Sequence, residues 1–209
     1  MEDSINSSNL ILSMLLGDGY AYGKKEKLLE FCHSTKQLGY AEWKMNLLKK
    51  NVHPDTKMTN KKHYPPQVRV FTPRHHRVTS AYKKIYVDGR KHMTMDILEK
   101  ITDIGVAIWY MDDGNAIWRN KTNSGNTPLL IRPQGIQLNT HAYSREDNEL
   151  ISKWFLEKYN VLFRLYTEKR GNTTFLRSTR KEHINRFVDI VYPYVAQVDC
   201  MKYKVEYAT

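Results

Sequence analysis

"ILSMLLGDG" at residues 11–19 and "VAIWYMDDG" at residues 106–114 are similar stretches, each running from apolar residues into an Asp-Gly pair. Their aspartates, Asp18 and Asp113, lie 95 positions apart. A single Asp-Gly is a common way to end a helix at a turn. Two copies, each preceded by a similar apolar run, indicate an internal repeat. Such a repeat would bring the two aspartates to matched places.

The segments that follow each copy support this repeat. Residues 20–34 read as two strands joined by a turn. Residues 35–50 predict an amphipathic helix. Its apolar positions are Leu38, Tyr40, Trp43, Leu47 and Leu48. Two further strands and a closing helix complete each half, so the sequence predicts an α+β fold of two pseudo-symmetric αββαββα repeats, residues 1–100 and 101–209.

The composition favours a polyanionic partner. The chain carries 33 Lys and Arg against 22 Asp and Glu, a formal net charge of +11, which favours nucleic acid. No apolar run approaches the ~20 residues that span a bilayer, and the N-terminus does not resemble a secretory signal. The two cysteines make no disulfide framework. We therefore expect an intracellular protein in a reducing compartment, with no membrane partner.

The paired aspartates predict a metal-dependent chemistry. If the two motif helices pack side by side, Asp18 and Asp113 meet at one end of their interface. Neighbouring carboxylates repel unless a hard divalent cation lies between them. Mg²⁺ suits such oxygen ligands and can promote phosphodiester cleavage. Gly17 and Asp112, which precede the two aspartates, are further candidates for the metal site; Asp112 could equally have only a supporting role at the helix end.

The same residues resemble a known family. The two motifs, together with "FCHSTKQLGYAEW", "VDGRKHMTMDILEKIT" and the closing "MKYK", are similar to the LAGLIDADG homing endonucleases, in particular to the single-chain, intron-encoded type. The resemblance implies two saddle-shaped antiparallel sheets that straddle DNA, with the motif helices forming the interface between the halves. It implies a monomer that cleaves a target of roughly 20 base pairs across the minor groove, leaving 3′ overhangs, and that promotes intron or intein-type mobility.

The resemblance also assigns roles to individual residues. Asp18 and Asp113 would bind the catalytic ions, Mg²⁺ or in its place Mn²⁺, while Ca²⁺ would support binding without cleavage. Basic residues near the metals would assist catalysis. These are Lys91, with Arg90 as the alternative, and Lys204, with Lys202 as the alternative. The family favours small residues where the motif helices cross. Ser13 and Gly17 fit this pattern, whereas Ile108 and Asp112 do not, so the second helix is expected to cross through Gly105 or Ala107 instead.

The predicted strands supply a DNA-binding surface. Alternating polar and basic side chains on a ribbon can read base edges in the major groove, while neighbouring Lys and Arg hold phosphates. The candidates are Tyr20, Tyr22, Lys24, Lys25, Lys27, Arg69, Arg74, His75, Trp118, Arg119, Arg132, Gln137, Asn139, Arg164, Tyr166, Lys169, Arg170 and Arg177. "PRHHR" at residues 73–77 reads as a DNA-contacting loop or a helix start. Trp43, Trp109, Tyr110 and Trp154 read as core.

Two other functions fit the same sequence. One is an RNA maturase that binds its host intron RNA, and the other is a catalytically silent DNA-binding protein. Retention of both Asp18 and Asp113 favours cleavage. The target sequence depends on which strand residues meet which bases and on DNA bending. The sequence therefore leaves the target open, and it leaves the host compartment open among mitochondrion, plastid, phage-infected bacterium and archaeon.

Overall fold

The computed structural model describes residues 5–61, 65–118, 133–168 and 173–206. The first half contains α1 (Ser7–Leu16), β1 (Tyr20–Tyr22), β2 (Leu28–Ser34), the 3₁₀ helix η1 (Thr35–Gln37), α2 (Leu38–Asn51), β3 (Lys57–Lys61), β4 (Gln67–Phe71) and α3 (His76–Ile85). A short connection follows, with β5 (Tyr86–Val87), β6 (Arg90–Lys91) and α4 (Met95–Leu98). The second half contains α5 (Asp103–Asp113), β7 (Gly114–Ile117), β8 (Gly135–Leu138), α6 (Arg145–Tyr159), β9 (Arg164–Thr167), β10 (Thr174–Ser178), α7 (Lys181–Val195) and the 3₁₀ helix η2 (Asp199–Lys204).

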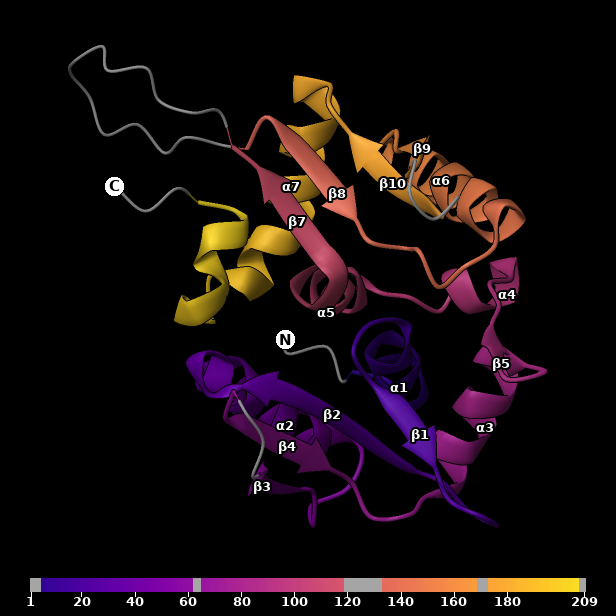
Figure 1. Ribbon diagram of the computed structural model, residues 1–209, viewed down its shortest axis with the longest axis vertical. Helices are drawn as coiled ribbons and strands as arrows, with labels where there is room; N and C mark the ends of the chain where they lie inside the picture. The colour runs from indigo at the N-terminus through magenta and orange to yellow at the C-terminus, as the bar shows by residue number, and fades with distance from the viewer. Residues whose placement is uncertain (1–4, 62–64, 119–132, 169–172, 207–209) are drawn as a thin grey trace.

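The predicted fold class is confirmed. The αββαββα order occurs twice, and each set of four strands forms an antiparallel sheet, in the orders β1-β2-β4-β3 and β7-β8-β10-β9. The register matches as well: Tyr20 pairs with Glu30, and Asn115, which also follows the motif glycine directly, pairs with Gln137. Figure 1 shows α1 and α5 side by side at the centre, with one sheet on each side.

The two motif helices form the centre of the core because they are apolar on every side. All residues from Leu10 to Leu16 in α1 and from Ile104 to Met111 in α5 are buried, as expected for a helix without a polar face. The Asn6 side chain caps α1 by accepting from the Ser8 N–H at 2.9 Å. Among the described residues, no helix is both long and apolar enough to cross a membrane.

The aromatic residues expected in the core behave unequally. Trp109, Tyr110 and Trp154 are buried as predicted. Trp43 is only partly buried and donates from Nε1 to the Gln197 side chain at 3.2 Å. The prediction for Leu38 is wrong, since this residue begins α2 and is 39% exposed. Lys44 lies on the buried face of α2 instead, with 0% exposure; its charge is neutralised by a partner described below.

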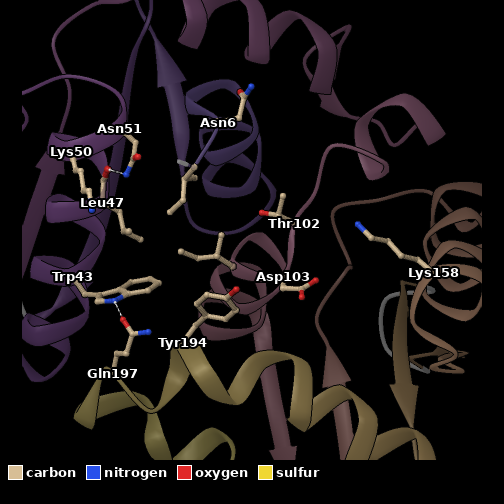
Figure 2. Close-up of a pocket in the computed structure, with 12 residues that line it drawn as sticks. Asn6, Trp43, Leu47, Lys50, Asn51, Thr102, Asp103, Lys158, Tyr194 and Gln197 are labelled. Atoms are coloured by element: carbon tan, nitrogen blue, oxygen red, sulfur yellow. Dashed lines mark hydrogen bonds between the residues drawn. The ribbon is translucent and has the colours of Figure 1, made fainter. Parts of the chain in front are cut away.

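A cavity of about 900 Å³ lies between the halves at the N-terminal ends of α1 and α5. Its lining includes Asn6 and Thr102, the residues that precede the two helices, together with Trp43 and Tyr194. Figure 2 shows residues of both halves around it. A helix of ten residues spans ~15 Å, so this cavity is a helix length away from Asp18 and Asp113, and it is not the site that the motifs predict.

Candidate active site

The interface between α1 and α5, called the seam below, is closely packed at two points. A Cβ on Gly105 would overlap the Ser13 side chain, lying 3.1 Å from its Cβ. A Cβ on Gly17 would lie 2.5 Å from the Cβ of Asp112 and 2.9 Å from its Cγ. Gly105 therefore provides the close approach expected in the second helix. The missing side chain of Gly17 leaves the space that Asp112 occupies.

Asp18 and Asp113 lie at the C-terminal end of this seam. Asp18 follows α1 and is exposed, whereas Asp113 ends α5 and is half-buried. Burial raises the pKa of Asp113 to about 7, and the negative charges of Asp112 and Asp18 add to this effect. Burial and Asp112 likewise raise the pKa of Asp18. The Asp18 charge thus acts on Asp113, and two neighbouring carboxylates of this kind offer oxygen donors that suit a hard divalent cation.

Asp112 has a different environment. Its buried carboxylate forms a salt bridge with Lys44 Nζ, at 2.9 and 3.0 Å, and accepts from Tyr40 Oη at 2.8 Å. It also accepts from the Asp18 backbone N–H at 3.1 Å. Burial opposes ionisation of Asp112, but the Lys44 charge and these hydrogen bonds hold its pKa below the ordinary value. Both oxygens are thus already engaged by groups of the first half.

His33, at the end of β2, connects this buried pair to Asp18. Its Nε2 lies 3.4 Å from Lys44 Nζ, and its Nδ1 lies 3.7 Å from the Asp18 carboxylate. Burial and the Lys44 charge lower the pKa of His33 to about 3, so the ring is neutral at pH 7. Atoms of Asp18, His33 and Asp112 lie within 4.8 Å of one another, yet Lys44 Nζ already supplies the positive charge there, which disfavours a metal ion at the Asp112 oxygens.

Each motif helix ends against a lysine. Lys91 Nζ donates to the carbonyls of Leu16 and Gly17, at 3.1 and 3.0 Å. Lys204 Nζ donates to the carbonyls of Tyr110, at 3.2 Å, of Gly114, at 2.9 Å, and of Met111. Cations are favourable at such C-terminal carbonyls. Burial lowers the pKa of both side chains, that of Lys204 to about 8, while the neighbouring aspartates oppose this shift.

The structure distinguishes these lysines from their alternatives. Arg90 is exposed on β6. Lys202 is partly exposed, and its Nζ pairs with Asp199 at 2.7 Å. Lys91 and Lys204 therefore occupy related places at the two helix ends, beside the paired aspartates. Their roles in catalysis stay predictions.

The first sheet presents a linked polar cluster among the predicted DNA-binding residues. Tyr20 and Tyr22 donate from their hydroxyls to the Glu30 carboxylate, Tyr22 at 2.8 Å. Arg69 forms an ion pair with Glu30 and donates to the Tyr22 hydroxyl at 2.6 Å. Glu30 is not among the predicted residues, and it is only 2% exposed. No local signal identifies it, because its partners Tyr20 and Arg69 belong to other strands.

The second sheet has a related arrangement with a neutral centre. Arg177 donates to Gln137 Oε1 from Nη2 at 2.6 Å, and Gln137 donates to Asn139 at 2.7 Å. The Arg177 guanidinium also lies 5.1 Å from the Tyr166 ring centroid. Arg164, directly opposite Arg177 in the register, is exposed. Both halves thus contain an arginine that pairs with the residue at the same register position, Glu30 in the first sheet and Gln137 in the second.

The remaining predicted contacts lie around these sheets. Lys24 and Lys25 are exposed in the β1–β2 turn, and Lys27 Nζ lies 4.1 Å from the Tyr82 ring centroid. His75 is the N-cap of α3, as the helix-start interpretation required, and it accepts from the Arg77 N–H at 3.1 Å. Arg74 beside it is exposed, and Trp118 is half-buried after β7. Outside the described residues lie Arg119, Arg132, Lys169 and Arg170.

Two apolar helices that cross through small residues, with acids at one end and a sheet on each side, define a pseudo-symmetric nuclease-like fold. The chain belongs to the LAGLIDADG DNA endonuclease family, whose model matches residues 9–187. The resemblance inferred from the motifs is therefore confirmed.

The chain is also similar to curated proteins. The chain is 27% identical over 206 residues to Protein RecA of Mycolicibacterium flavescens, covering 94% of this chain and 45% of that protein. It is 23% identical over 224 residues to cytochrome b mRNA maturase bI2 of Saccharomyces cerevisiae, covering 97% and 48%. The chain thus spans about half the length of these relatives.

Among solved structures, the homing endonuclease I-WcaI bound to its DNA recognition sequence matches with a TM-score of 0.76 and 21% identity, covering 99% of this chain and 89% of that one. I-DmoI in complex with DNA and Ca matches with a TM-score of 0.53 and 16% identity, covering 91% of each chain. These likenesses show the shared fold.

Proposed function

We propose that this protein is a site-specific endonuclease that cleaves both strands of DNA with the help of divalent metal ions. The observation that carries the proposal is the placement of Asp18 and Asp113 at the same end of the seam, where the charge of Asp18 adds to the rise in the Asp113 pKa and the Asp112 side chain accepts from the Asp18 N–H. Family membership and the fold shared with DNA-bound homing endonucleases support it. The excess of positive charge suits a DNA partner.

Asp18 and Asp113 are the residues that would hold the metal, Mg²⁺ in this proposal. A bound divalent ion lowers the pKa of water and stabilises a departing oxygen. Mn²⁺ would substitute for Mg²⁺, and Ca²⁺ would support binding alone. The Gly17 carbonyl and the Asp112 carboxylate were candidates too, but they accept hydrogen bonds from Lys91 and Lys44, respectively, so we assign them supporting roles.

Lys91 and Lys204 would act on the phosphates. Their ammonium groups are fixed at the ends of the two motif helices by carbonyl oxygens. Positive charge that is already oriented stabilises the negative charge that develops on a reacting phosphate, because no reorganisation is needed at the moment of reaction. One such lysine in each half suits cleavage of two strands.

The two sheets would bind the target. Each is four-stranded and antiparallel, with helices on one face, which leaves the other face for DNA. A monomer with two such sheets would span roughly 20 base pairs, about two turns of duplex. In this proposal, cleavage across the minor groove leaves 3′ overhangs and promotes mobility of an intron or intein-type element.

The experiment that tests the proposal uses a DNA library that includes the uninterrupted form of the element's own insertion site. We expect double-strand cleavage with Mg²⁺ and binding without cleavage with Ca²⁺. Asp18→Asn and Asp113→Asn should each abolish cleavage and leave binding intact. Asp55→Asn, an exposed acid outside the site, is the matched control and should cleave normally. Binding without cleavage under every divalent ion would reject the endonuclease in favour of a silent DNA-binding protein.

A second candidate function is supported by one finding. The similarity to maturase bI2 extends over 97% of this chain, which favours an RNA partner on the same scaffold. The host intron RNA, added to the same assays, separates the two functions. RNA binding that assists splicing, with no cleavage of any DNA, would establish the maturase in place of the endonuclease.

A further inference from the structure

Lys44 is a cation in the hydrophobic core. It is 0% exposed, and its Nζ lies 4.1 Å from the Phe31 ring centroid and 4.9 Å from that of Tyr40. A buried charge is strongly destabilising unless it is paired. Its partner is Asp112, and since Lys44 lies on α2 and Asp112 on α5, the salt bridge crosses the seam between the halves.

The repeat shows that this position can be filled without a charge. Glu30 and Gln137 occupy matched register positions, and Lys44 and Ile151 each follow 14 residues later. Ile151 is likewise buried on its helix. In the motifs, Gly17 matches Asp112, because each directly precedes the Asp-Gly pair. The positions that match this ionic pair in the repeat therefore hold two uncharged residues, Ile151 and Gly17.

Stability alone gives a weak reason for the ionic version, because well-packed apolar residues often replace a buried ion pair without loss. The geometry supplies another reason. Asp112 is the chain neighbour of Asp113, and its Oδ2 accepts from the backbone N–H of Asp18 at 3.1 Å. Lys44 also contacts His33, whose other ring nitrogen faces the Asp18 carboxylate. The pair is therefore linked to both paired aspartates.

We propose that Lys44 is a positioning residue which, through its salt bridge with Asp112 across the seam, fixes the placement of Asp18 relative to Asp113. Lys44 does not touch the DNA or the metal, since it is buried. It holds the Asp112 carboxylate in the one place where that group accepts from the Asp18 N–H, and it holds the His33 ring beside the Asp18 side chain. The effect on catalysis rests on the proposed endonuclease function, while the effect on Asp18 geometry does not.

The test compares an apolar pair with a neutral hydrogen-bonding pair. Lys44→Ile with Asp112→Ala introduces the isoleucine of the other half, with alanine in place of its glycine, and removes the acceptor of the Asp18 N–H. Lys44→Gln with Asp112→Asn removes both charges but keeps an acceptor oxygen. Lys49→Ile, the same substitution at an exposed position of α2, is the matched control. Single Lys44→Ile leaves Asp112 buried without its cation and should lower the urea midpoint, which the apolar pair should restore.

Two measurements report on position. In a ¹H–¹⁵N spectrum, the apolar pair should shift the Asp18 amide upfield and speed its hydrogen exchange, while the neutral pair should return it toward the wild-type position. On a target that the wild-type protein cleaves, the apolar pair should lower kcat about tenfold or more with little change in KM, because misplacement of reacting groups by about 1 Å has effects of that size. The neutral pair should recover part of the rate.

Opposite outcomes overturn the proposal. If the apolar pair folds stably, keeps the Asp18 amide signal and cleaves at the wild-type rate, the salt bridge has only a packing role. If the apolar pair does not fold, the neutral pair decides, and an Asp18 amide signal and a cleavage rate equal to those of the wild type in that variant, which lacks the salt bridge, reject the proposal. If the wild-type protein cleaves no DNA, the endonuclease proposal fails, while the Asp18 amide still tests the positioning.

Discussion

Gly105 is the position where the close packing of the seam is most directly testable. It lies in the first turn of α5, and a Cβ added to it would overlap the Ser13 Oγ while lying 3.0 Å from Ile101 Cγ2 and 3.1 Å from Ser13 Cβ. Ser13 is buried in the middle of α1 and donates to the Asn9 carbonyl at 2.8 Å. The serine therefore has little freedom to move aside, and Gly105→Ala must push the two helices apart.

The net effect of Gly105→Ala is a difference between two opposing contributions. Replacing a helical glycine by alanine stabilises the helix by up to about 1 kcal/mol. Adding volume to a packed core costs about 1–3 kcal/mol. Because the new atom would meet three atoms below the usual contact distance, we place the cost at the upper end of that range. The expected net loss is about 1–2 kcal/mol in the free energy of unfolding.

Urea unfolding at equilibrium measures this loss, and two further variants control for it. Gly39→Ala adds a methyl near the start of α2, where the only atom met within 4 Å is Cys200 Sγ at 3.8 Å; it should stabilise the protein by about 0.5–1 kcal/mol. Ser13→Gly combined with Gly105→Ala moves the small residue to the other helix and should restore most of the loss. A Gly105→Ala variant as stable as the wild type, or no restoration by Ser13→Gly, would refute this account of the seam.

Other expectations concern the site and the sheets. Lys91→Met and Lys204→Met should lower the cleavage rate more than DNA binding, and Lys202→Met, the control, should change neither. Single-turnover kinetics measures the cleavage rate and a gel shift measures binding. A loss of binding alone would contradict the assignment. Glu30→Gln should alter the base preference of the first sheet, because it weakens the ion pair that orients Arg69. Selection from randomised DNA measures this preference. An unchanged preference would show that the cluster does not contact bases. Binding should weaken about 10³- to 10⁵-fold between 50 and 200 mM salt if six to ten phosphates are contacted. Sedimentation should show one chain per duplex, and a stable homodimer would contradict the monomer.

The elements that local sequence specifies could be predicted. The apolar runs of the two motifs and the Asp-Gly pairs predict buried helices with defined ends, and the structure has them at Ser7–Leu16 and Asp103–Asp113. The order of strands and helices follows from alternation and turn signals in the same way. These signals extend over a few residues, so they can be recognised in the sequence without knowledge of the tertiary structure.

The buried polar groups could not be predicted in this way. Lys44 reads as a solvent-facing residue because lysine is almost never fully buried unless it is paired, and its partner Asp112 lies 68 positions away. Glu30 is held by Arg69, which belongs to another strand and lies 39 positions later in the sequence. In both cases the deciding interaction joins residues from different elements, and no local period of the sequence encodes such a pairing.

The asymmetry of the seam bears on why this fold is built from one chain. The Asp112 side chain occupies the space that a Cβ on Gly17 would need, with atoms at 2.5 and 2.9 Å from that position. Positions 17 and 112 therefore cannot both carry a side chain, because an aspartate on one helix requires a glycine on the other. A homodimer with identical halves would have two aspartates there, which would clash, or two glycines, which would leave the space of Asp112 empty and Lys44 without its partner. Only halves that differ in sequence can pair Asp112 with both Gly17 and Lys44, and the covalent link between the halves ensures that the differing halves meet. The packing of the seam therefore supports the proposed monomer independently of its activity.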